Sequence, residues 1–158
     1  MSEIPRVLRF RVPGIPRPGG SKRAFVNKKT GRAIITEDCT RSKDWRSVVT
    51  AFAHDAMMGH ELFTGPIAVE FIFYLARPKG HFRTGAHAGE IRTFAPIYPA
   101  VKPDTTKYVR STEDAMTGIV WRDDAQIVDQ TAYKRYCNAP DCAITAKMGC
   151  VITVKELI

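Results

Sequence analysis

Four aspartates in the second half of the sequence are the residues best suited to chemistry. Asp104, Asp114, Asp123 and Asp124 fall within 21 positions. Carboxylate oxygens that converge on one point bind hard cations such as Mg²⁺, and such a cation polarises a phosphate and lowers the pKa of an attacking water. Metal-dependent phosphodiester hydrolysis is therefore one interpretation. The other is structural: Asp104 caps a helix, and Asp123 and Asp124 form a turn.

Two cationic side chains share this segment. Lys107 and Arg110 are about one helical turn apart, and Arg110 precedes Asp114 by four residues. A fixed cation facing a scissile phosphate stabilises the charge that develops on its oxygens. The alternative for Arg110 is a surface ion pair with Asp114, which stabilises a helix by only roughly a few tenths of a kcal/mol. The spacing leaves both interpretations open.

The elements that carry these residues are predicted from hydrophobic periodicity and turn signals. Residues 104–118 have helical spacing, with Asp104 at the cap and Gly118 at the end. The segment 67–75, apolar at every position except Glu70, predicts a central strand. The other predicted elements are strands at 7–12, 127–136 and 144–154, a hairpin across 24–36, and a first helix that ends near Gly59.

This order of elements favours an α+β fold: a single domain over residues 1–158, with a single mixed sheet of about five strands packed on two main helices. Two loops interrupt it. Residues 13–32 form a basic loop rich in Pro and Gly, and residues 77–103 form a long irregular loop. Loops of the second length are uncommon and often functional. Its Phe82 and Phe94 either stack on DNA bases or pack beneath the loop, and we expect packing.

The positive charge is concentrated at one end of the chain. The whole sequence has 24 Lys and Arg against 16 Asp and Glu, a net charge of +8, and the first fifty residues have 12 against 4, so 12 − 4 = +8 arises there alone. Such asymmetry favours a polyanion partner, because neutralised phosphates release counterions; an idle basic surface is the alternative. The predicted contacts with such a polyanion are basic side chains of the first loop and one helix, namely Arg17, Lys22, Arg23, Lys28, Lys29, Arg32 and Lys107.

Several classes of protein are excluded. No apolar segment approaches the roughly 20 residues that cross a bilayer, and the N-terminal segment lacks the apolar core of a signal peptide. There is no phosphate-binding glycine loop and no Gly-x-Ser-x-Gly motif. The four cysteines are too few for a disulfide framework and are interpreted as reduced thiols. We therefore expect a cytoplasmic protein that does not associate with membranes.

Three segments together resemble the RusA family of Holliday junction resolvases: KPDTTKYVR at 102–110, EDAMTG at 113–118 and WRDDAQIV at 121–128. The loop at 16–23 also has a counterpart in the family. The resemblance implies a homodimeric endodeoxyribonuclease that depends on Mg²⁺, with Mn²⁺ as a possible substitute, and needs no small-molecule cofactor. Its substrate would be branched DNA, the four-way junction of recombination, repair or phage DNA processing. Members are common in bacteriophages and prophages, which implies a bacterial host cell.

The resemblance also implies roles for individual residues. By position, Asp104 and Asp124 match catalytic aspartates of the family, and Asp123 stands beside them as a further metal ligand. Arg110 occupies the position of the family's catalytic lysine, which keeps the positive charge but changes its geometry.

One position departs from the family pattern. Thr106 stands where the family has a second aspartate in the helix motif, and a hydroxyl cannot neutralise a cation. Three accounts compete: fewer carboxylates hold the metal, Asp114 or Asp123 substitutes, or the protein binds junctions without cutting them. We expect activity, because three carboxylates suffice for one ion. A weaker alternative is a basic phage protein that binds DNA or RNA generally.

Overall fold

The computed structural model describes residues 4–20, 22–26, 28–37, 42–137 and 148–158. Its main sheet has four strands in the order β1-β6-β4-β5. Their bounds are Val7–Pro13 for β1, Ile67–Leu75 for β4, Ile127–Tyr136 for β5 and Gly149–Glu156 for β6. The sheet is mixed: β6 runs antiparallel to both β1 and β4, whereas β4 and β5 are parallel.

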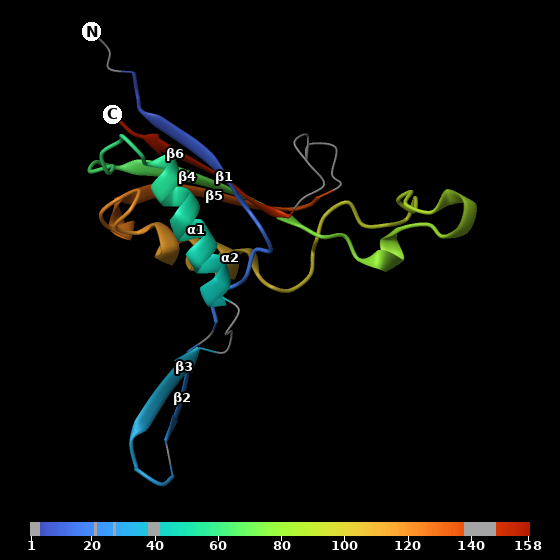
Figure 1. The fold of residues 1–158 in the computed structure, drawn as a ribbon, viewed down its shortest axis with the longest axis horizontal. Coiled ribbons are helices and arrows are strands. Elements are labelled where there is room, and N and C mark those ends of the chain that lie inside the picture. The colour runs from blue at the N-terminus through green and yellow to red at the C-terminus, as the bar shows by residue number, and fades with distance from the viewer. Residues whose placement is uncertain (1–3, 21, 27, 38–41, 138–147) are drawn as a thin grey trace.

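Two helices pack on one face of this sheet (Figure 1). The first, α1, spans Ser42–Ala56, and the second, α2, spans Thr105–Met116. They contact each other, α1 crosses β1, and α2 lies against β5. The α+β class, the mixed sheet and the two helices are therefore as predicted. Residues 138–147, which include the start of the predicted strand 144–154 and its preceding turn, lie outside the described residues.

The predicted sheet of about five strands is wrong in one respect. The hairpin strands β2 (Lys22–Val26) and β3 (Ala33–Glu37) pair only with each other in a separate two-stranded sheet. The segment before them does not turn back along β1. Instead, the backbone N–H of Gly19 donates to the carbonyl of Lys107 on α2, at 2.8 Å, so the chain crosses that helix. The hairpin then extends away from the main sheet (Figure 1).

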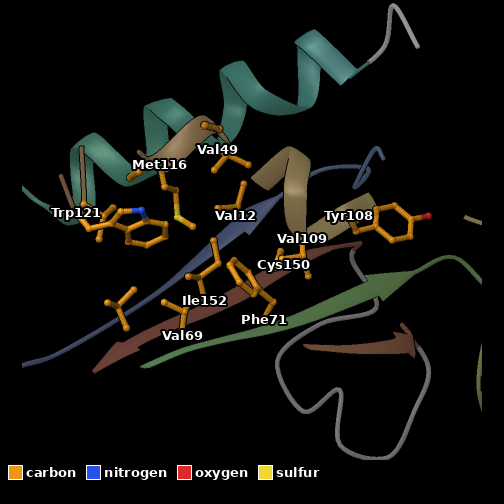
Figure 2. Close-up of a cluster of buried hydrophobic side chains, with 14 of the residues drawn as sticks. Val12, Val49, Val69, Phe71, Tyr108, Val109, Met116, Trp121, Cys150 and Ile152 are labelled. Atoms are coloured by element: carbon orange, nitrogen blue, oxygen red, sulfur yellow. The ribbon is translucent and has the colours of Figure 1, made fainter. Parts of the chain in front are cut away.

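The core lies between the sheet and the helices (Figure 2). Strand β4 is central because alternate side chains, Ile67, Val69, Phe71 and Phe73, are buried under the helices. Trp121 and Met116 lie at one end of this cluster and Tyr108 at the other. Each fully buried large apolar side chain stabilises the fold by about 1.5–3 kcal/mol. The core therefore fixes α2 firmly on the sheet.

Two further expectations concern the described residues. Within them, no helix has the length and apolar character to span a bilayer. Cys137 and Cys150 are buried and form no disulfide, whereas Cys39 and Cys142 lie outside the described part of the chain.

The start of β6 tolerates no side chain at Gly149. A Cβ added there would lie 2.3 Å from the backbone oxygen of Val12 on β1, the residue before its pairing partner Pro13. We expect Gly149→Ala to lower the free energy of unfolding by about 1–3 kcal/mol, since the strands must separate locally. Urea denaturation checks this. Gly65→Ala is the matched control, because no atom lies within 4 Å of its added Cβ; equal losses in both variants would contradict the explanation.

Candidate active site

Asp104 occupies the N-cap position of α2 but does not act as a capping side chain. No hydrogen bond joins its carboxylate to the first turn of the helix, and the residue is exposed. The alternative in which the Asp104 side chain serves as a helix cap is therefore not what the structure shows. Its oxygens are free of the bond that a capping aspartate normally accepts.

The backbone before Asp104 is anchored to the sheet. Lys134 on β5 donates through Nζ to the carbonyl of Val101 at 2.7 Å and to that of Pro103 at 3.0 Å. The Lys102–Pro103 peptide bond is cis. One side chain of an edge strand thus fixes the residue that directly precedes Asp104.

Asp124 is oriented by two donors. Its Oδ1 accepts from Thr117 Oγ1 at 2.6 Å and from Trp121 Nε1 at 2.8 Å. Trp121 is fully buried, whereas Asp124 itself is exposed. Thr117 is held in turn by the Glu113 carbonyl, which accepts from its backbone N–H at 3.0 Å. The Thr117 hydroxyl also lies 3.0 Å from that carbonyl, but its one hydrogen serves a single acceptor, and the contact with Asp124 is the shorter. The core and the end of α2 therefore fix this carboxylate at the surface.

Asp123 has a local structural role. Its Oδ1 accepts from the backbone N–H of Ala125 at 2.8 Å and caps the short 3₁₀ turn Asp124–Gln126. Gln126 completes a capping box, because its Oε1 accepts from the backbone N–H of Asp123. Its Nε2 donates to the carbonyls of Phe63 and Gly65, both at 2.9 Å. The turn interpretation thus applies to Asp123, and its role as a metal ligand stays a prediction.

Asp104 and Asp124 stand at opposite ends of α2. The helix has 12 residues, a length of about 18 Å, and Asp124 is bonded to the residue that ends it. Two oxygens on one Mg²⁺ ion lie only about 4 Å apart. Among the described residues, no group of three or more His, Cys, Asp or Glu side chains is placed to hold a metal. One protomer therefore does not bring the two predicted aspartates together.

Glu113 is a further acidic residue beside Asp124 that the sequence interpretation missed. It accepts a hydrogen bond from Gln130 Nε2 on β5. Burial raises the pKa of the Glu113 carboxyl; the Gln130 bond opposes this rise, and the charges of Asp124 and Asp114 add to it. The sequence did contain a signal for Glu113, namely its spacing. It lies on one face of the helix with Thr106, Arg110 and Thr117, at intervals of three or four residues.

Glu113→Gln should make stability less sensitive to pH. A carboxyl whose pKa is raised on folding binds its proton more tightly in the folded state, so wild-type stability falls as the pH rises through the interval above the ordinary value. The amide removes this loss and still accepts from Gln130. We expect the variant to be more stable than wild type at pH 8 and not at pH 4, as measured by thermal unfolding. The same difference at both values would contradict the assignment.

The cations of α2 face solvent. Thr106, Lys107 and Arg110 are exposed, and within the described part of the chain no ion pair joins Arg110 to Asp114. The alternative interpretation of Arg110, a surface ion pair with Asp114, is therefore wrong. At about 1.5 Å per residue, Arg110 lies roughly midway between the two aspartates.

The predicted DNA contacts lie along the chain that crosses α2 and continues into the hairpin. Arg17 is half-buried in the crossing segment, and Lys22 and Arg23 belong to β2. Lys28, Lys29 and Arg32 are exposed at the hairpin turn. Because Gly19 is bonded to Lys107, this basic extension leaves the body beside the first turns of α2. That these residues contact DNA stays a prediction.

Comparison with known proteins identifies the family of this chain. A sequence model of the family described as "Endodeoxyribonuclease RusA" matches residues 13–147. The chain is also 27% identical over 138 residues to the uncharacterized protein YqaN of Bacillus subtilis (strain 168), which covers 84% of this chain and 90% of that protein. The family match contains α2, the Trp121–Asp124 turn and the basic hairpin. The chain therefore belongs to the RusA endodeoxyribonuclease family.

Proposed function

We propose that this protein is a metal-dependent endonuclease that resolves four-way DNA junctions. The observation that carries the proposal is membership of an endodeoxyribonuclease family together with exposed carboxylates at both motif positions, Asp104 and Asp124. The basic extension beside α2 supplies the charge that a junction, with its many phosphates, requires.

The donor chemistry fits Mg²⁺. Both aspartates present hard oxygen ligands at the surface, which is what this ion selects. The ion would polarise the scissile phosphate and lower the pKa of the attacking water. Thr117 and Trp121 would keep Asp124 oriented, as outer-shell donors do for ligating carboxylates. Arg110 would face the phosphate and stabilise its developing charge.

The distance between the two aspartates supports a dimer. Since α2 separates them by about 18 Å, they can share an ion only if they come from different chains. In a two-fold dimer, Asp104 of one protomer would meet the partner's Asp124, and symmetry would repeat this arrangement once. Two such sites would match the paired incisions that a junction requires. Each protomer would then supply half of each site.

Cleavage of a labelled synthetic four-way junction tests the function. With Mg²⁺ we expect paired nicks near the branch, and with EDTA or on a linear duplex of the same sequence we expect none. A second candidate, junction binding without cleavage, is favoured by Thr106 and by the lack of a three-carboxylate group in the described residues. Binding in a gel shift without nicking, in Mg²⁺ or in Mn²⁺, would select this second candidate.

A further inference from the structure

The loop at residues 77–103 is an ordered arm that projects from the body (Figure 1). At its root, Arg77 donates to the Pro96 carbonyl at 2.7 Å, and its guanidinium lies 4.4 Å from the centre of the Tyr136 ring. Lys134 holds the other end of the arm through the two carbonyls described above. The arm is thus tied to the end of β5 at both of its ends.

The tip of the arm is closed by its own hydrogen bonds. Phe82 and Ile91 form an antiparallel bridge. The backbone N–H of Arg83 donates to the Glu90 carbonyl at 2.7 Å, and that of Arg92 donates to the His81 carbonyl at 2.9 Å. Phe82 is half-buried by these contacts, as expected, but the same prediction is wrong for Phe94, whose side chain is 78% exposed.

A hollow of about 290 Å³ opens at this tip. Phe94 and Ile91 give it apolar walls, and the guanidinium of Arg92 lies 5.8 Å from the centre of the Phe94 ring. Arg83 and Glu90 also line it and form an ion pair at 3.0 Å; Glu90 further contacts His87 at 3.2 Å. The one acidic group of the hollow is therefore already neutralised.

Both arginines keep donors for a ligand. An arginine side chain has five N–H groups. Arg83 uses Nη1 for Glu90, and Arg92 uses Nε for the Phe82 carbonyl at 2.9 Å. The whole arm has five Lys and Arg against one Glu, so 5 − 1 = +4. An exposed ring framed by cations on a basic arm is the combination that binds unpaired nucleotides: a base stacks on the ring, and arginines hold its phosphate.

We propose that the hollow formed by Arg83, Ile91, Arg92 and Phe94 binds an unpaired nucleotide of branched DNA, with its base stacked on Phe94. This inference rests on the proposed function, since it requires a DNA substrate. A linear duplex offers no such base, because its bases are stacked within the helix, whereas a distorted branch point does. Since the arm is held together before binding, little conformational entropy is lost when the nucleotide enters.

Fluorescence anisotropy in EDTA, which blocks cleavage, tests the proposal. Phe94→Ala should weaken binding to single-stranded DNA and to the four-way junction by about tenfold, and leave binding to linear duplex unchanged. Phe94→Trp should restore wild-type affinity. Ile97→Ala is the matched control: its side chain is 66% exposed on the same arm but does not line the hollow.

Two outcomes would overturn the proposal. If Phe94→Ala binds all three DNAs like wild type, the hollow holds no base. If Phe94→Ala and Ile97→Ala both dissociate a dimer in analytical ultracentrifugation, the arm instead contacts a second copy of the chain. Failure of the proposed function gives a different result, because wild-type protein would then cut no junction while the loss of single-strand binding in Phe94→Ala would persist.

Discussion

Two inactive variants, Asp104→Asn and Asp124→Asn, should regain nicking when they are mixed and allowed to exchange subunits. Each variant alone should lose junction cleavage by about 10³-fold or more, which corresponds to about 4 kcal/mol of transition-state stabilisation. In the mixed dimer one site would carry both substitutions, and the other would keep Asp104 of one protomer and Asp124 of the other. We therefore expect single nicks in place of paired incisions.

The reasoning depends on the length of α2, which keeps the two aspartates about 18 Å apart in each chain. The control is a mixture in which both protomers carry Asp124→Asn, which should stay inactive. A mixture of the two different variants that stays inactive, although mass spectrometry shows that subunits have exchanged, would contradict a site shared between chains. Full activity of either variant alone would contradict the assignment of the aspartate concerned.

Trp121→Ala should cause the largest loss of stability of any change discussed. This indole is completely buried between the helices and the sheet, and replacing a buried Trp with Ala costs about 3–5 kcal/mol. For a chain of this size the loss corresponds to a fall of about 10 °C in Tm. Differential scanning calorimetry measures this.

Trp121→Phe separates packing from orientation. It keeps an aromatic ring in the core but removes the Nε1 donor to Asp124 Oδ1. Loss of such an outer-shell donor typically lowers metal affinity or activity by about 10–100-fold. We expect Trp121→Phe to need more Mg²⁺ for half-maximal cleavage while remaining much more stable than Trp121→Ala. An unchanged Mg²⁺ requirement would show that Thr117 alone suffices to orient Asp124.

The regular elements were predictable because their patterns are local. The almost entirely apolar segment at 67–75 is the central strand β4, and the periodic segment after Asp104 is α2. Strand β5 has the predicted bounds even though half of its side chains are exposed. Its β-branched and aromatic residues supplied the signal, since such residues favour strands on partly buried surfaces.

The features that could not be predicted from the sequence depend on contacts between residues that are distant in the chain. The hairpin leaves the sheet because Gly19 is hydrogen-bonded to α2, and hydrophobic periodicity cannot predict such a contact. The arm at 77–103 contains two short 3₁₀ turns, Lys79–His81 and Gly85–His87, and a bridge between Phe82 and Ile91, all too short to produce a periodic pattern in the sequence. The separation of Asp104 and Asp124 does follow from helix length, but only once the far end of α2 is known to hold Asp124.

The two carbonyl contacts of Lys134 give the arm and the backbone before Asp104 a common anchor on β5. They join a strand of the main sheet to the segment between the arm and Asp104. A nucleotide held by the arm and a metal ion held by Asp104, both as proposed, would therefore be positioned from the same lysine. Lys134 would thus set where the bound DNA lies relative to that carboxylate.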